Sequence, residues 1–417
     1  MLLCHIVLAR SLGVTGFGEY AQAITWFQVL CVIGKLGLDN TSLRYVSEYV
    51  TKGETGKLRG FAKDSTRASV FASTIIMLCL IAIAWVFWNA IGERLASCLM
   101  IAAAMIPLVT LRQIQEASLR GVGQLFNSQI SMAIWPLILF VLAGIVWQIS
   151  PSSMTSPVAT FLQLISVGIV SAIVYRFLRH SPLKLGDETA METCRRQWTN
   201  SAVAFLVAEL LIVLKSRVCV AMAGILLGRD SAGLYAAMER FADVSILGGQ
   251  SLGLVIAPQF AALFAAGRYP EMRRLMRQGQ ILGLAFTVPV AIVVACLGDF
   301  VFVLLGTGYR EGWTTLVALL VSACITSFAG PAAYVLQMTG RERTMLVITA
   351  ACAVSNIVLS LVLMGPFGIL GLGFSQIVTS LVWTIGVRLS LSQHPAWQHE
   401  TSECALTESG FGSKDVP

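Results

Sequence analysis

Two long stretches of this 417-residue chain contain no charged side chain. No Asp, Glu, Lys or Arg occurs between Gly121 and Tyr175, or between Thr344 and Val387. The hydrocarbon core of a bilayer is about 30 Å thick, and a helix needs about 20 apolar residues to cross it. Each stretch is too long for one crossing and fits two, joined by turns at 151–153 and 365–368, where Pro and Gly favour a reversal. The chain is therefore predicted to cross a membrane several times.

The composition agrees with a membrane protein, because only 12% of the residues are charged, against about 25% in soluble domains. We predict an all-α, polytopic bundle of about twelve transmembrane helices in two six-helix lobes. The spans are placed at 1–13, 19–43, 68–91, 95–114, 128–149, 157–178, 201–227, 234–257, 280–305, 313–338, 344–364 and 368–391. The first helix is predicted to be truncated, since its dozen or so residues cover about 18 Å. Either the true start lies upstream or half a span is missing.

Basic residues gather in alternate connections between these spans. One set of connections holds Arg44, Lys52, Lys57, Arg59, Lys63, Arg67, Arg120, Arg176, Arg179, Lys184, Arg195, Arg196, Arg268, Arg273, Arg274, Arg277, Arg341 and Arg343. The other set holds only Arg94, Arg229 and Arg310. The positive-inside bias places the first set, and both termini, in the cytoplasm. It also accounts for the net charge of +7, so we predict no nucleic-acid partner.

Two segments outside the spans carry separate expectations. Residues 259–278 have apolar and basic residues at helical spacing, which favours an interfacial helix on the cytoplasmic face. Residues 393–417 are polar and are predicted to form a disordered tail.

The cysteines and histidines indicate neither a disulfide framework nor a metal site. The ten cysteines show no CxxC pair, and most lie in apolar spans, where cysteine is a small packing residue. The four histidines are scattered. We predict no metal and no cofactor.

An internal repeat organises the chain. Leu12–Tyr20 resembles Leu227–Tyr235, and the same offset aligns the basic loop 44–59 with 259–274. Six spans then repeat as six, so both lobes insert with the same orientation, as in transporters built from parallel repeats. We assign the lobes to 1–190 and 195–392.

Several ionisable residues are predicted to lie deep in the spans, where charge is costly and usually faces a protein interior or a wet cavity. They are Lys35 and Asp39 on the second span, Glu209, Lys215 and Arg217 on the seventh, and Glu239, Arg240 and Asp243 on the eighth. Lys35 and Asp39 are four apart and could pair. Lys215 and Arg217 are about 200° apart on a helix, and Arg217 is closer in azimuth to Glu209.

Two interpretations of these charges remain open. They could line a central cavity that contacts a polar, anionic substrate, with Arg217, Lys215, Lys35, Arg240 and Gln250 as binding candidates. Glu209, Asp39, Glu239 and Asp243 would then be candidates for ion coupling or ion pairing. Alternatively, the charges lock the bundle through interhelical ion pairs, and Arg240, between two acids, would be locally paired. Gln250 is placed opposite Lys35 by the repeat, which suggests a cleft between the lobes.

The opening of the chain resembles a known family. The matching residues are Leu8–Gly13, Gly18–Tyr20, Leu36–Asp39, Arg44–Glu48 and Gly53–Arg59, with later landmarks at Leu119–Gln124 and Gly365–Gly371. Their order and spacing resemble the bacterial polysaccharide-export (Wzx-type) flippases, in the superfamily that also holds the MATE drug exporters, known as the MOP superfamily. The resemblance extends to about residue 391.

The resemblance implies two six-helix lobes, alternating access, location in the bacterial inner membrane and a lipid-linked oligosaccharide as cargo. The implied partners are that lipid, the surrounding membrane lipids and the polysaccharide polymerase and export machinery. It also implies that cavity cations contact the pyrophosphate of the polyprenyl carrier, a role that Arg217 and Lys215 could take by position. Relatives often carry an acidic residue shortly before the Gly224/Gly228 pair, which this chain lacks, so Glu209 is the alternative for ion coupling.

Three functions are compared. The first is a flippase for an undecaprenyl-pyrophosphate-linked saccharide in exopolysaccharide, O-antigen or capsule synthesis. The second is a MATE-like, cation-coupled exporter of small organic cations, which needs an acidic cavity. The predicted cavity has slightly more cations than carboxylates, which favours an anionic head group. The third is an enzyme, which is disfavoured because the loops are short and the longest cytoplasmic one, 179–198, shows no catalytic constellation.

Overall fold

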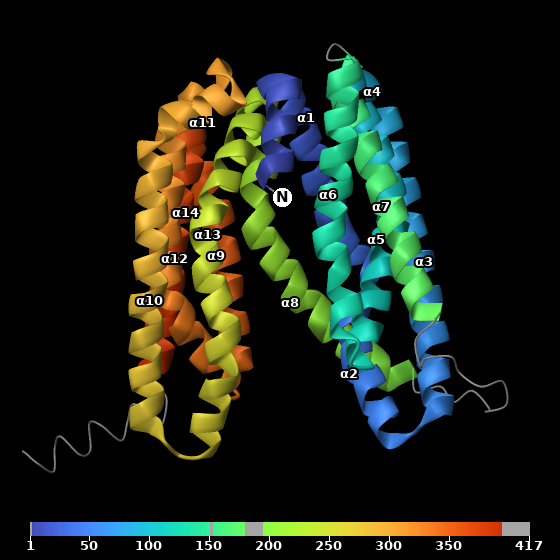
Figure 1. The fold of residues 1–417 in the computed structure, drawn as a ribbon, viewed down its shortest axis with the longest axis vertical. Helices are drawn as coiled ribbons and strands as arrows, with labels where there is room; N and C mark the ends of the chain where they lie inside the picture. The colour runs from blue at the N-terminus through green and yellow to red at the C-terminus, as the bar shows by residue number, and fades with distance from the viewer. Residues whose placement is uncertain (1, 151–152, 180–194, 394–417) are drawn as a thin grey trace, which may run out of the picture. The chain divides into compact units, whose positions relative to one another are not determined.

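The computed structural model describes residues 2–150, 153–179 and 195–393, and every regular element in these ranges is a helix (Figure 1). The α-helices and the two short helical turns are α1 (Leu2–Lys35), α2 (Leu38–Lys52), α3 (Thr55–Val86), α4 (Trp88–Ile91), α5 (Glu93–Gly121), α6 (Leu125–Ile149), α7 (Ser156–Arg179), α8 (Arg195–Met222), η2 (Ala223–Leu227), α9 (Arg229–Ala265), α10 (Tyr269–Cys296), α11 (Gly298–Leu305), η3 (Thr307–Gly312), α12 (Trp313–Met338), α13 (Glu342–Phe367) and α14 (Ile369–Ser392). Among the described residues, ten helices are long and apolar enough to cross a bilayer, or up to eleven if the bent pair α1–α2 forms one span. The predicted all-α, polytopic architecture is confirmed.

The chain folds into two compact units. Unit 1 comprises residues 1–237 and 302–311, and unit 2 comprises 238–301 and 312–417. Helix α8 packs against α1 and α2 and so belongs to unit 1. The predicted lobes at 1–190 and 195–392 were drawn from the sequence repeat rather than from packing, and that division stays a prediction.

Helix α5 forms the centre of unit 1, packed against α1, α2, α3 and α7. Its small and medium side chains at Cys98, Ala102, Met105 and Ile106 are fully buried. Small residues let helices approach closely inside a membrane, where van der Waals packing rather than the hydrophobic effect holds them together. In unit 2 the same role falls to α12, which packs against α10 and α14. Serine and threonine hydroxyls bond across these helices, as between Ser322 and Ser380 at 2.7 Å.

Two glycines with positive φ break the first part of the chain. Gly13 has φ 69° and separates the short first helical segment from the rest of α1. Gly37 has φ 70°, next to Leu36 at φ 56°, and the helix is interrupted here within the predicted span 19–43. The chain bends by 42° between α1 and α2, because left-handed residues cannot continue a right-handed helix. A Cβ at Gly37 would collide with the Ala202 carbonyl oxygen on α8, so only glycine fits this crossing.

The predicted interfacial helix at 259–278 is also not a single element. Helix α9 continues to Ala265, the chain reverses at Gly267 (φ +68°), and α10 begins at Tyr269 with Pro270 in its first turn. A left-handed glycine followed by a proline ends one helix and starts the next. The predicted tail lies outside the described residues from 394 onwards, as does most of the 179–198 loop.

A buried charge fastens the start of α9 to α1 within unit 1. Glu19 on α1 is only 2% exposed. It accepts a hydrogen bond from Ser156 and pairs with Nη1 of Arg229 at 2.8 Å, while Nη2 of Arg229 donates to the Ile91 carbonyl oxygen. Sequence reasoning placed Arg229 among ordinary loop charges and gave Glu19 no role. The backbones of Gly18 and Gly233 cross beside this cluster, since a Cβ on Gly18 would meet the Arg229 carbonyl oxygen.

Gly18→Ala is expected to destabilise the protein by about 1–3 kcal/mol, the usual cost of overpacking a tight contact. The matched control is Gly144→Ala on α6, where a Cβ would meet nothing within 4 Å and alanine favours the helix. The thermal unfolding midpoint of the purified protein in detergent should fall for Gly18→Ala and stay level or rise for the control. Equal midpoints would contradict the close crossing.

Candidate functional site: a polar cavity in unit 1

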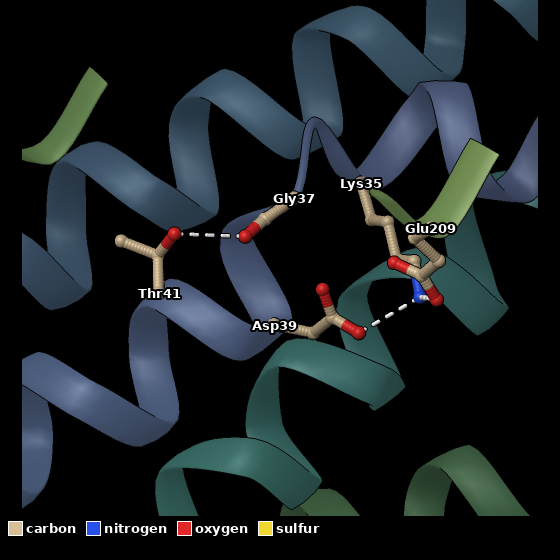
Figure 2. Close-up of polar contacts among 5 residues, drawn as sticks. All are labelled: Lys35, Gly37, Asp39, Thr41 and Glu209. Carbon is tan, nitrogen blue, oxygen red and sulfur yellow. Dashed lines mark hydrogen bonds and ion pairs between the residues drawn. The ribbon is translucent and has the colours of Figure 1, made fainter. Parts of the chain in front are cut away.

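A buried lysine lies between two carboxylates at the broken end of α1. Lys35 is 4% exposed, and its Nζ donates to Oδ2 of Asp39 at 2.7 Å and to Oε1 of Glu209 (Figure 2). Asp39 comes from the first turn of α2 and Glu209 from the middle of α8. The Thr41 hydroxyl donates to the Gly37 carbonyl oxygen at 2.8 Å and closes that first turn. The predicted pairing of Lys35 with Asp39 is confirmed.

The triad carries more negative than positive charge. One ammonium serves two carboxylates, and Asp39 Oδ1 and Glu209 Oε2 are buried with no hydrogen-bond partner among the described residues. Each of the two carboxylates therefore has one oxygen that Lys35 does not bind.

The triad borders a cavity of about 290 Å³ inside unit 1. Lys35, Glu209 and Arg217 all line it, together with Gln28, Gln113, Trp135 and Gln163 from neighbouring helices. Arg217, which the sequence places closer in azimuth to Glu209, lines the same cavity as that residue. Lys215 is not among its lining residues, and the roles of both cations stay predictions.

A second cavity of about 300 Å³ shares Lys35, Arg112, Gln113 and Trp135 with the first, so the two are adjacent and are together called the polar space. Its walls add Glu116 and Arg120 from α5 and Ser131 from α6. Arg112 pairs with Glu116 at 2.7 Å, with both side chains 13% exposed. Sequence reasoning missed this α5 group because Arg112 and Glu116 fall at the end of a predicted span. Their spacing of four was the available signal.

Unsatisfied polar atoms point to a site built for a polar ligand. The Nε atoms of Arg112 and Arg120, Oε1 of Gln113, Oγ of Ser131 and Nε1 of Trp135 are buried and have no hydrogen-bond partner among the described residues. Such atoms are rare in folded proteins, because each one costs desolvation energy. The lining cations are Lys35, Arg112, Arg120 and Arg217, and the lining carboxylates are Asp39, Glu116 and Glu209. The cations are in excess.

The remaining predicted site residues lie on the part of α9 that belongs to unit 2. Arg240 pairs with Asp243 at 3.1 Å and with Glu239 at 3.8 Å, so the local pairing of Arg240 is confirmed. Gln250 is exposed. None of the four lines the two cavities of unit 1, and the placement of Gln250 opposite Lys35 stays a prediction. Among the described residues, no group of three or more His, Cys, Asp or Glu side chains could hold a metal ion.

Ten or more helices long and apolar enough to cross a bilayer, with charged side chains around a cavity in unit 1, define the class of multi-pass membrane proteins. The family model described as polysaccharide biosynthesis protein matches residues 2–264, which is more than half of the chain. The chain therefore belongs to the polysaccharide biosynthesis protein family, as the resemblance predicted. A second model, MatE, matches residues 204–362.

Solved structures share the fold at low sequence identity. An inward-facing multidrug resistance MATE family transporter of the MOP superfamily aligns with a TM-score of 0.78 and 14% identity, covering 94% of this chain and 95% of that one. The lipid II flippase MurJ, in an inward closed conformation, aligns with a TM-score of 0.68 and 12% identity, covering 99% and 91%. A MOP superfamily transporter from Pyrococcus furiosus, described by a reversed polarity of its binding pocket, aligns at 0.62 and 12%, covering 94% and 95%. No curated protein matches the chain in sequence.

Lys35→Met should destabilise the protein by about 3–5 kcal/mol, because it leaves the buried Asp39 and the partly buried Glu209 without their counter-charge. Glu209→Gln should cost much less, since the Lys35–Asp39 pair remains and an amide can still accept from the lysine. The two variants can be compared by unfolding midpoint in detergent. A larger loss for Glu209→Gln than for Lys35→Met would show that the triad is not held by Lys35.

Proposed function

We propose that this protein is a flippase that moves an undecaprenyl-pyrophosphate-linked oligosaccharide across the bacterial inner membrane by alternating access. The cargo would serve exopolysaccharide, O-antigen or capsule synthesis. Transport would not change the cargo chemically. The observation that carries the proposal is the cation excess in the polar cavity, together with membership in the polysaccharide biosynthesis family.

The cavity offers what a pyrophosphate head group needs. Guanidinium groups bind phosphate oxygens through two parallel hydrogen bonds, and Arg112 and Arg120 each have a buried Nε with no partner among the described residues. The attraction is stronger than in water, because the surroundings have a low dielectric constant. Gln28 and Gln113 supply amide groups, and the ring of Trp135 supplies an apolar face for sugar rings. Lys215, Arg240 and Gln250 stay binding candidates from the sequence.

The carboxylates of the triad are the candidates for energy coupling. Asp39 and Glu209 share one lysine, so a cation that reaches either carboxylate would compete with Lys35 for it. Such a change alters the charge that faces the head group and could release it. Glu239 and Asp243 remain coupling candidates from the sequence alone.

The orientation follows from the basic connections described above, which place both termini in the cytoplasm. The head group then enters from the side on which it is synthesised. The polysaccharide polymerase and export machinery are the expected partners on the other side.

A MATE-like exporter of organic cations is the second candidate. The MatE match at 204–362 and the likeness to a MATE transporter favour it, as do the carboxylates of the triad. The cations of α5 weigh against it, because Arg112 and Arg120 would repel a cationic cargo.

Deletion of the gene should cause lipid-linked oligosaccharide to accumulate in the cytoplasmic leaflet. Complementation with Arg112→Ala or Arg217→Ala should restore transport about tenfold to hundredfold less well than the unmodified gene, since a hydrogen bond to a charged group contributes about 1.5–3 kcal/mol. Arg343→Ala, at an exposed position on α13, is the matched control and should restore it fully. The readout is the amount of lipid-linked sugar in extracted membranes.

Two results would count against the proposal. One is unchanged lipid-linked sugar in the deletion strain together with altered resistance to cationic dyes, which is the outcome expected of the exporter. The other is loss of the folded protein in the arginine variants, which is the outcome expected if these charges only lock the bundle.

A further inference from the structure

A large apolar groove lies beside the polar cavity and is distinct from it. Its volume is about 700 Å³, within the range of about 300–1,000 Å³ typical of ligand pockets. It is bounded by the α1–α2 turn, by α3 and by α8, all in unit 1. Leu36, Leu38, Phe71, Trp198, Val203 and Leu206 are among its walls.

The turn between α1 and α2 forms a wall between the groove and the polar cavity. Lys35 and Asp39 line the polar space, while Leu36 and Leu38, which lie between them in sequence, line the groove. On α8, Leu206 lines the groove and Glu209 lines the polar space. Gly37, in the middle of the turn, lies close to the backbone of α8. Unit 1 therefore offers an apolar site and a polar site next to each other.

Positive charge accompanies the groove along α3. Arg59, Lys63 and Arg67 are spaced by four and therefore share one face of the helix, in the half predicted to lie near the cytoplasmic surface. Arg67 itself lines the groove and is exposed. Basic residues at a membrane surface attract anionic lipid head groups by about 1 kcal/mol each. One carboxylate, Asp64, also lines the groove, so Arg67 and the basic residues before it on α3 outnumber the acid there. The groove thus combines an apolar surface with a net positive edge that suits a lipid phosphate.

We propose that this groove is a loading site for the carrier lipid, in which its isoprenoid chain lies between α3 and α8 and its phosphate meets Arg67. The inference rests on the proposed function, because it assigns to the groove the lipid half of that substrate. At this site only the turn between α1 and α2 separates the head group from the polar cavity. Loading at the groove would select the carrier from the surrounding phospholipid before transport begins.

The test is photocrosslinking of the full-length protein in phosphatidylethanolamine–phosphatidylglycerol vesicles that hold a small fraction of undecaprenyl phosphate. p-Benzoylphenylalanine replaces Val203 in the groove or, as the control, Ile212, which lies on the opposite face of the same helix and is not among the groove's lining residues. The two residues have similar exposure, 53% and 58%. The ratio of undecaprenyl phosphate to phospholipid adducts, read by mass spectrometry, is expected to be about tenfold higher at 203, equivalent to about 1.4 kcal/mol. Equal ratios would mean that ordinary phospholipid fills the groove and would overturn the inference.

Two pairs of variants sharpen the result. Ala68→Trp places a large ring in the groove and should lower the ratio at 203 to that at 212, whereas Val70→Trp, on the same helix but not among the groove's lining residues, should leave it unchanged. Arg67→Glu should lower the ratio and Arg67→Lys should retain it, which separates phosphate binding from simple filling. An undiminished ratio in both Ala68→Trp and Arg67→Glu would overturn the inference.

The binding readout is independent of transport. If the ratio is high at 203 but deletion of the gene leaves lipid-linked sugar unchanged, the groove binds the lipid and the proposed function fails. If deletion causes accumulation while the ratios are equal, the function stands and the loading site fails.

Discussion

The interior of unit 1 depends on the ammonium group of Lys35. A charge at this depth is costly unless it is paired, and Lys35 is held by one carboxylate from α2 and one from α8. The pairing joins three helices at the point where the chain turns from α1 into α2. The same lysine borders both polar cavities. Removing it would leave the cavity wall without its cross-link and the carboxylates without a counter-charge.

This arrangement is possible only because the helix breaks at Leu36 and Gly37. Glycine in a left-handed conformation bends the chain by 42° and allows the α8 backbone to approach so closely that no Cβ would fit. The close approach brings Glu209 to Lys35 across 174 positions of sequence. A straight helix through this point would carry side chains that hold α8 away. Backbone geometry here sets the electrostatics of the site.

The sequence predicts those features that depend on local spacing. Charge-free stretches give the helices, a spacing of four gives the Lys35–Asp39 pair, and helical azimuth places Arg217 with Glu209. It does not give Glu209 as the partner of Lys35, because no local pattern encodes a contact between distant helices. The sequence did not identify Arg112 and Arg120 as cavity residues for a different reason. Basic residues at span ends are common under the positive-inside bias, so their burial is visible only once α5 is known to be the central helix.

The excess of cations over carboxylates in the cavity indicates which kind of cargo fits it. If the charges only held the helices together, each cation should have an acidic partner, because an unpaired buried charge destabilises the fold. Here cations exceed carboxylates, and guanidinium nitrogens stay unsatisfied while Arg112 and Lys35 already have acidic partners. A head group with several anionic oxygens would complete this set, whereas a cationic drug would add to the excess. The apolar groove across the wall extends the argument, because it gives the same ligand a place for a long hydrocarbon chain.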